Sequence, residues 1–353
     1  MKNTFGSNIA VTLFGESHSS HIGAVVDGMP CGIAVDENFI KSQLTLRSPY
    51  GDISTARKEP DSFKIVSGVF NGKTTGTPLC IIIENTNIDS SDYELNRTVA
   101  RPSHADYTGF CKYNGFNDYR GGGHFSGRLT APLVAVGAIA ISALREKNIY
   151  IGTHISRCGK INDREFQNIR SDIDSLNNKK FAVLDEENGE LMKTEIKKAA
   201  EQGDSVGGIL ETAITGIPAG TGEPWFDSVE SQIAHIIFSI PGIKGIEFGS
   251  GFAIADKFGS EANDEYRIEN GNIVTATNNN GGINGGISNG MPIIFRCAVK
   301  PTPSIAKKQN TVDFVKKENT EIEIKGRHDP AFIHRARVVV DSVTALAVMD
   351  LMK

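Results

Sequence analysis

The segment from Asp118 to Arg128 combines three features that bind anions. It reads Asp-Tyr-Arg-Gly-Gly-Gly-His-Phe-Ser-Gly-Arg. The glycines leave backbone amides uncovered, while Arg120 and Arg128 add guanidinium groups that can bind phosphate or carboxylate in a forked geometry. An apolar run with Pro132 near its beginning follows, which is typical of a helix N-terminus and favours negative charge there. The pattern predicts an anion site; the alternative is a glycine-rich surface turn between two solvated arginines.

Two histidine-containing segments upstream could supply proton transfer. His18 lies between Glu16 and His21, and His104 lies two residues before Asp106. Imidazole titrates near neutrality and can give or take a proton, and the Asp106 carboxylate could hold the tautomer of His104. The first group would also suit a metal, but its spacing does not match a helical HExxH site, so we predict no metal. The alternative for either segment is a surface loop whose polar side chains have no catalytic role.

Glycine is the outlier in composition and marks further loops. The chain has 37 glycines among 353 residues, clustered at 121–123, 206–208, 242–251 and 281–290. Such clusters between apolar runs are typical of functional loops rather than of a fibrous repeat. None of them forms a GxxxxGK[ST] phosphate loop or a GxGxxG motif, so ordinary ATP and dinucleotide sites are not predicted. A last loop, 325–330, joins lysine, arginine, histidine and aspartate.

Net charge and cysteine content restrict the partner and the compartment. The formal net charge is −5, which argues against nucleic acid as a partner. The five scattered cysteines form no CxxC pair, which favours a reduced, cytoplasmic compartment. The N-terminus lacks an apolar signal region, and we find no run of about 18 apolar residues that would predict a membrane span. A small anionic ligand is therefore the partner that the arginines indicate.

Strand-like and helix-like runs do not alternate regularly, which predicts an α+β fold with antiparallel sheets. We expect one domain over residues 1–353, with a charged, solvated insertion near 160–190 (Asn162–Glu190). The predicted strands are Ile9–Phe14, Gly23–Val26, Phe63–Val66, Leu79–Ile83, Ile149–Ile155, Ile209–Ile214, Ile246–Ile254, Pro292–Val299 and Ala336–Val340. The predicted helices are Asp36–Leu44, Ala131–Glu146, Val229–Ile240 and Ser342–Met352.

Seven motifs in one order resemble the chorismate synthase family from about residue 5 to residue 352. They are GESHS, RPSHADY, YRGGGHFSGR, SIPGIKGIEFGSGF, GGINGGISNG, KPTPS and GRHDP. The resemblance implies a helical layer between antiparallel sheets, and a homotetramer. It also implies a lyase of the shikimate pathway that converts 5-enolpyruvylshikimate 3-phosphate to chorismate and phosphate by 1,4-anti elimination. The reaction is redox-neutral yet needs reduced FMN, and NADP is also associated with the family.

The resemblance assigns roles to residues of this chain. It implies His18 as the acid for the departing phosphate, His104 beside the reduced flavin, and Asp329 near flavin N5. Ser17 and Ser126 match serines proposed to relay protons. The substrate-binding arginines would be Arg47, Arg101, Arg128 and Arg327. The flavin contacts would be His124, Phe125, Ser126, Pro241, Gly242, Gly285, Lys300, Pro301, Thr302, Pro303, Ser304 and Arg327.

The chain departs from the usual family motifs at several positions. Ser19 and Ser103 replace glycines, His124 and Phe125 replace an arginine and a serine, and Arg47 stands where several arginines are common.

Two other functions remain open from the residues alone. A flavin-dependent oxidoreductase acting on a phosphorylated molecule would need a nicotinamide site, and a non-catalytic phosphoester-binding protein would leave the histidine loops unused. No extra domain is recognisable, so we expect an external flavin reductant.

Overall fold

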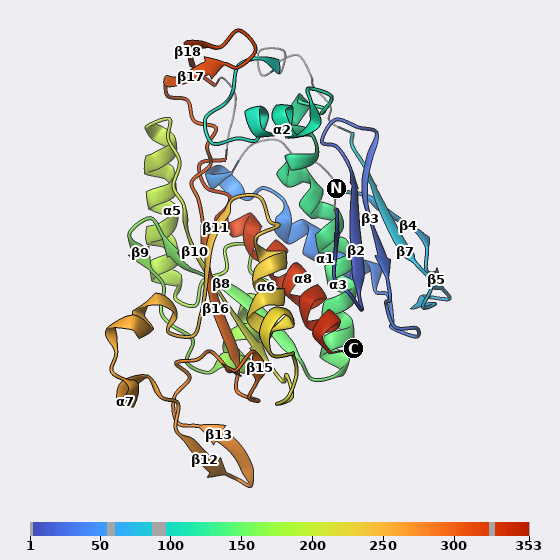
Figure 1. Ribbon diagram of the computed structural model, residues 1–353, viewed down its shortest axis with the longest axis vertical. Helices are drawn as coiled ribbons and strands as arrows, with labels where there is room; N and C mark the ends of the chain where they lie inside the picture. Colours follow the sequence, from blue (N-terminus) through green and yellow to red (C-terminus); the bar gives the residue numbers. More distant parts are fainter. Residues whose placement is uncertain (1–2, 55–60, 87–96, 325–328, 353) are drawn as a thin grey trace.

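Two five-stranded antiparallel sheets enclose a layer of helices in the computed structural model (Figure 1). The structure describes residues 3–54, 61–86, 97–324 and 329–352. Helix α3 (Thr130–Glu146) packs against the first sheet, and helix α8 (Ile333–Leu351) packs against the second sheet and against α3. The predicted α+β fold, with a helical layer between antiparallel sheets, is confirmed.

The first sheet positions the first histidine loop. Its strands, in spatial order, are β1 (Thr4–Phe5), β2 (Ala10–Gly15), β3 (His21–Asp27), β7 (Leu79–Glu84) and β4 (Phe63–Ser67). Along β7, Leu79, Ile81 and Ile83 are fully buried and alternate with more exposed residues, the period of two that a half-buried strand requires. Strands β2 and β3 pair as a hairpin, so the loop 16–20 between them stands at one end of the sheet.

The second sheet carries the loops that follow in the chain. Its strands, in spatial order, are β11 (Ile243–Phe248), β16 (Ile293–Val299), β10 (Gly208–Thr215), β8 (Tyr150–Cys158) and β9 (Ile161–Asn162). The N-terminal end of β11 and the C-terminal end of β16 pair at Ile243 and Val299. This register places the loop before β11 beside the segment after β16. Two of the predicted flavin-binding motifs, the one with Pro241 and Gly242 and the KPTPS motif, are therefore neighbours in the fold.

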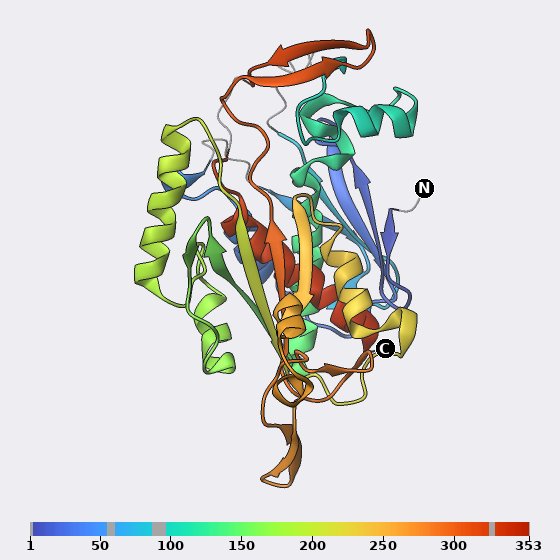
Figure 2. The ribbon, with the colours of Figure 1, turned by 60° about the vertical axis from the view of Figure 1, so that its left-hand side comes forward.

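The helical layer is buried on nearly every side because sheets cover both of its faces. Helices α1 (Glu37–Arg47) and α6 (Val229–Ile237) complete it, and Figure 2 shows α8 running between the sheets. In α3, all residues from Thr130 to Ile141 are buried. By length and composition, the helical stretch Arg120–Glu146 would suffice to cross a membrane, but 89% of its most apolar window is buried inside the protein, as in a core helix.

The remaining elements lie around this three-layer core. They are α2 (Asp106–Tyr113), α4 (Ile169–Leu176), α5 (Glu186–Glu201), α7 (Gly259–Ala262), β5 (Val69–Phe70) with β6 (Lys73–Thr74), β12 (Tyr266–Glu269) with β13 (Asn272–Thr275), β14 (Ile283–Asn284) with β15 (Ile287–Ser288), and β17 (Gln309–Asp313) with β18 (Glu318–Ile322).

Three sequence predictions about elements were wrong. Residues 336–340 are not a strand but part of α8, because a run of buried β-branched residues has no period that separates a buried strand from a buried helix. The strand predicted over Ile246–Ile254 ends at Phe248, where Gly249 and Gly251 adopt positive φ and a 3-10 turn follows. The segment near 160–190 is not simply solvated, since α4 packs on β8 and Ile173, Leu176 and residues 181–183 are buried.

Candidate active site

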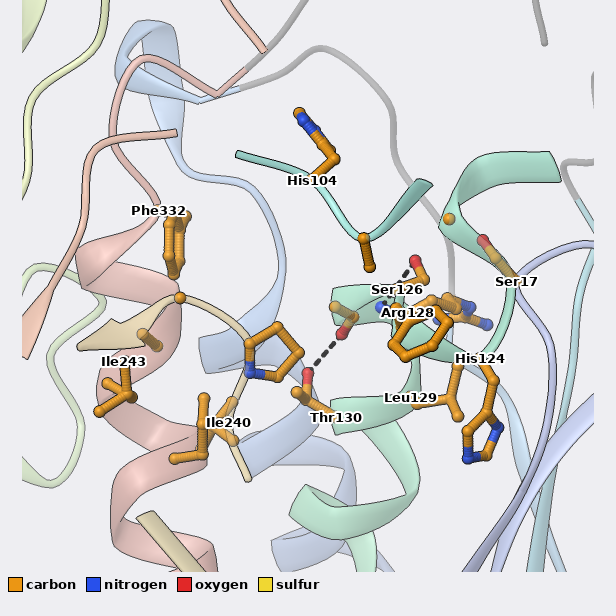
Figure 3. A pocket seen from close by; sticks show the side chains of 18 of the residues that line it. Ser17, His104, His124, Ser126, Arg128, Leu129, Thr130, Ile240, Ile243 and Phe332 are labelled. Carbon is orange, nitrogen blue, oxygen red and sulfur yellow. Dashed lines mark hydrogen bonds between the residues drawn. The ribbon is translucent and has the colours of Figure 1, made fainter. Parts of the chain in front are cut away.

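A cavity of about 1410 Å³ gathers most of the residues that the sequence singles out. In Figure 3, His104 lies above the cavity, Ser17, Ser126 and Arg128 border it on one side, and Ile240, Ile243 and Phe332 border it on the other. The predicted site residues in its lining are Ser17, Arg47, Arg101, His104, His124, Phe125, Ser126, Arg128, Pro241, Gly242, Lys300, Thr302, Pro303, Ser304 and Asp329.

A few predicted site residues lie elsewhere. Gly285 lies in the turn between β14 and β15, and it and Pro301, both within the described chain, are outside the cavity lining. His18 is buried directly behind the lining, beside Gly121. Arg327, together with His328, falls outside the residues that the structure describes.

The three glycines let two loops pack tightly. Gly121, Gly122 and Gly123 have φ values of +57°, +82° and +54°, in the left-handed region that favours glycine. A Cβ on Gly121 would lie 2.9 Å from Ser17 Oγ and overlap the His18 ring, and the Ser17 amide donates a 3.0 Å hydrogen bond to the Gly123 carbonyl. The glycine run therefore fixes the place of the first histidine loop.

The side chains around the glycines have partners of their own. The guanidinium of Arg120, which the sequence predicted to bind an anion, forms two hydrogen bonds of 2.9 Å with Asp118, and Arg120 is not among the described residues that line the cavity. His124 Nδ1 lies 2.7 Å from the Gly15 carbonyl, which ties the glycine turn to the end of β2. Ser126 Oγ accepts from the Arg128 amide and caps the turn that leads into α3.

Arg47 and Arg128 meet at one carboxylate. Arg47 lies at the end of α1 and donates to Asp61 Oδ2 at 2.9 Å, while Arg128 donates to Asp61 Oδ1. Arg47 also donates to the Thr130 hydroxyl at 2.8 Å, and Arg128 donates to the Asn85 side chain at 3.0 Å. All these side chains are buried to at least nine-tenths, so each guanidinium is held in one orientation.

Arg101 and His104 are held by different groups from those that the sequence suggests. Asp106 does not hold the His104 imidazole; it forms two charged hydrogen bonds with Arg101, of 2.9 and 2.7 Å. His104 Nδ1 lies 3.1 Å from the Pro102 carbonyl, and Nε2 lies 2.9 Å from Ser304 Oγ. Burial, followed by the Arg101 charge, lowers the pKa of His104 to about 4.

A further ion pair lies in the cavity lining, between Asp329 and Arg335. Arg335, on α8, pairs with Asp329 and donates from Nε to the Arg47 carbonyl at 2.9 Å. Lys300 donates to the Ser103 carbonyl at 2.7 Å, and burial is the main reason that its pKa lies below the usual value. The KPTPS segment is thus tied to the second histidine loop through both Lys300 and Ser304.

Comparison with known proteins shows the family of the chain. The family model described as chorismate synthase matches residues 9–352. The chain belongs to the chorismate synthase family. A chorismate synthase from Pyrococcus abyssi is 45% identical over 345 residues, covering 98% of this chain and 96% of the relative. One from Dehalococcoides mccartyi strain BAV1 is 44% identical over 354 residues, covering 99% and 96%.

A solved structure agrees with this assignment. A crystal structure of chorismate synthase superimposes with a TM-score of 0.76 at 28% identity, covering 98% of this chain and 92% of that chain. Membership in the chorismate synthase family makes this chain an enzyme, a lyase of the shikimate pathway that acts on a phosphorylated small molecule. The cation-lined cavity agrees with such a substrate.

Sequence reasoning missed several residues of this candidate site. Asp61 and Asn85 hold arginines, and Arg335 holds Asp329, yet none of the three belongs to a motif that we recognised. Arg335 follows Asp329 by six residues and lies in the first turn of α8, and this spacing matches no motif that predicts an ion pair. Asp61 and Asn85 come from the two ends of the β4–β7 region, and only the folded sheet brings them to Arg128.

Proposed function

We propose that this chain converts 5-enolpyruvylshikimate 3-phosphate to chorismate and phosphate by 1,4-anti elimination, with reduced FMN as cofactor. The observation that supports this most strongly is the cavity, whose described lining takes residues from all of the seven motifs except GGINGGISNG. These motifs lie far apart in the chain, so their convergence on one cavity is a property of the fold.

The lining fits a flavin together with a second ligand. Pockets for drug-sized ligands typically measure about 300–1,000 Å³, and this cavity of about 1410 Å³ is larger. Phe125, Pro241 and Pro303 offer flat apolar surface for a ring system, and Lys300 offers a cation for a phosphate group. These residues, with 302–304, would hold FMN, and its reduced form would supply electron density that helps the substrate C3–O bond to break.

The chain itself supplies orientation, charge and proton transfer. Arg47, Arg101 and Arg128 bind the anionic groups of the substrate, because a phosphate clamped by cations leaves more readily. His18 gives a proton to the departing phosphate, with Ser17 and Ser126 as relay groups at the cavity edge. Arg327, which lies outside the described residues, carries the same charge and is proposed as a fourth substrate arginine.

His104 and Asp329 act on the flavin side of the reaction. With a pKa of about 4, His104 is neutral near pH 7 and can accept a proton at Nε2, where Ser304 is its partner. The Asp329 carboxylate, oriented by Arg335, is proposed to fix the protonation state near flavin N5. His124, Phe125, Gly242, Gly285 and Pro301 complete the proposed flavin contacts.

The resemblance to the family also motivates a proposal about the assembly, compartment and reductant of the enzyme. We propose a single domain that works as a cytoplasmic homotetramer and receives its reduced flavin from an external reductant, with any NADP-dependent step belonging to that reductant. The scattered cysteines, which form no CxxC pair, support the compartment.

The test compares three anaerobic reactions of the wild-type protein with 5-enolpyruvylshikimate 3-phosphate. One contains chemically reduced FMN, one oxidised FMN and one no flavin. Chorismate should form only with reduced FMN. Full turnover without flavin, or an oxidised product in place of chorismate, would refute the proposal.

A further inference from the structure

Asp61 occupies an unusual place in the site. Its side chain is only 3% exposed, and each carboxylate oxygen contacts a different guanidinium, Oδ2 that of Arg47 and Oδ1 that of Arg128. Its backbone has a φ of +45°, a region that residues other than glycine seldom adopt. Aspartate tolerates this region better than most residues, and the backbone here holds its carboxylate between two arginines.

The other described acceptors of the two arginines are neutral. Arg47 donates to the Thr130 hydroxyl and the Gly127 carbonyl, at 2.8 and 3.0 Å, and Arg128 donates to the Asn85 amide oxygen and the Glu84 carbonyl, at 3.0 and 3.3 Å. These bonds already fix the planes of both guanidinium groups. Orientation alone therefore does not require a carboxylate at position 61.

Asp61 is also in the position that a ligand oxyanion would take. Asp61, Arg47 and Arg128 all line the cavity. A carboxylate that gives one oxygen to each of two guanidinium groups has the same bonding pattern as one face of a phosphate or of a substrate carboxylate. Its negative charge also repels such a ligand, and this repulsion is strong where water is excluded.

We infer that Asp61 is an internal competitor for the anion subsite formed by Arg47 and Arg128. An anionic ligand displaces it from at least one guanidinium, so Asp61 limits how tightly the subsite holds an oxyanion. It also neutralises part of the buried positive charge, which would otherwise destabilise the fold. Such competition would favour product release in an enzyme that forms phosphate, because a lower affinity for the free anion speeds its dissociation. Only this statement about product release rests on the proposed function; the competition itself does not.

Isothermal titration with inorganic phosphate tests the competition without turnover. Asp61→Asn keeps the size of the side chain and one acceptor oxygen but removes the charge, and it should lower the phosphate Kd about tenfold. The control is Asp172→Asn, which removes the same charge from a buried carboxylate paired with Arg164, outside the described cavity lining. The control should bind phosphate as the wild type does. An unchanged or higher Kd in folded Asp61→Asn would show that Asp61 only orients the arginines.

A second measurement covers the case in which Asp61→Asn does not fold. A crystal structure of the wild-type protein with saturating phosphate should show the anion on Arg47 and Arg128, with the Asp61 carboxylate moved off at least one of them. Phosphate bound while both Asp61 contacts remain would overturn the inference. Neither measurement depends on catalysis. A wild-type protein without chorismate-forming activity would therefore refute the proposed function but would not affect the conclusion about Asp61 and phosphate.

Discussion

His104 is held by two hydrogen bonds that define its tautomer. The Pro102 carbonyl can only accept, so Nδ1, 3.1 Å away, carries the proton, and Nε2 is left to accept from the Ser304 hydroxyl. Burial disfavours the charged imidazole, and the Arg101 guanidinium adds to the effect. At the residue scale, His104 is therefore a neutral group at physiological pH, although an exposed histidine would be partly charged.

We expect His104 to titrate near pH 4. Its folded-state pKa lies below the usual histidine value of 6.5, so the unfolded chain binds the proton more readily, and His104 lowers stability as pH falls from 6.5 towards 4. The measurement is a proton NMR titration of the histidine Cε1–H signals, with His104→Gln to assign the resonance. A midpoint near 6.5 would show that the imidazole is not buried in this way.

Replacing Gly121 should disturb catalysis through His18. Gly121→Ala adds a Cβ that overlaps the His18 ring, at a φ of +57° that alanine adopts with strain. Because displacing a catalytic group by about 1 Å can cost about 100-fold in rate, we expect a loss of that order in kcat. Gly259→Ala is the control, since nothing lies within 4 Å of its added Cβ, it is outside the described cavity lining, and its activity should stay near wild type. Equal activities in the two variants would contradict the packing argument.

At the scale of elements, sequence patterns predicted the strands and helices better than the connections between them. Strand β7 was recognised from its apolar residues bounded by turn formers, and α3 from its long apolar run. The buried valines of α8, by contrast, were assigned to a strand. The site motifs were found because histidine, arginine and glycine cluster locally. Their partners were missed because Asp61 and Arg335 reach the site only through tertiary packing, and Asp106 was given the wrong partner, since sequence proximity does not show which way a side chain points.

A buried histidine anchors the segment containing α4 to the second sheet. His154 on β8 lies 2.8 Å from Asp163 and 3.0 Å from Glu211. Burial works against the charged imidazole, but the hydrogen bonds to Asp163 and Glu211 outweigh it and raise the pKa of His154. The stabilising contribution is therefore fully present below the unfolded pKa of 6.5 and is lost as pH rises through the folded pKa.

His154→Gln should cost more stability in acid than in base. Breaking a buried charge pair typically costs about 3–5 kcal/mol, so we expect a loss of that order in urea unfolding at pH 6 and a clearly smaller one at pH 9. His21→Gln, at an exposed histidine of β3, is the control and should change stability little at either pH. A pH-independent loss in His154→Gln would mean that packing, not charge, holds the segment.

At the scale of the whole molecule, the chain exposes several large apolar side chains. Trp225, Phe226, Phe252 and Phe258 are each more than three-quarters exposed. We expect the proposed homotetramer to form in solution, and multi-angle light scattering at micromolar concentration should give a mass near four times the 38.1 kDa of one chain. A mass near 38.1 kDa would contradict it.

The central claim is that the cavity carries out a redox-neutral elimination. The most direct measurement follows phosphate release and the flavin absorbance in one anaerobic reaction, with excess 5-enolpyruvylshikimate 3-phosphate over reduced FMN. We predict many phosphates released per flavin, with the flavin as reduced at the end as at the beginning. Release of one phosphate per flavin, with oxidised FMN accumulating in step, would contradict the account.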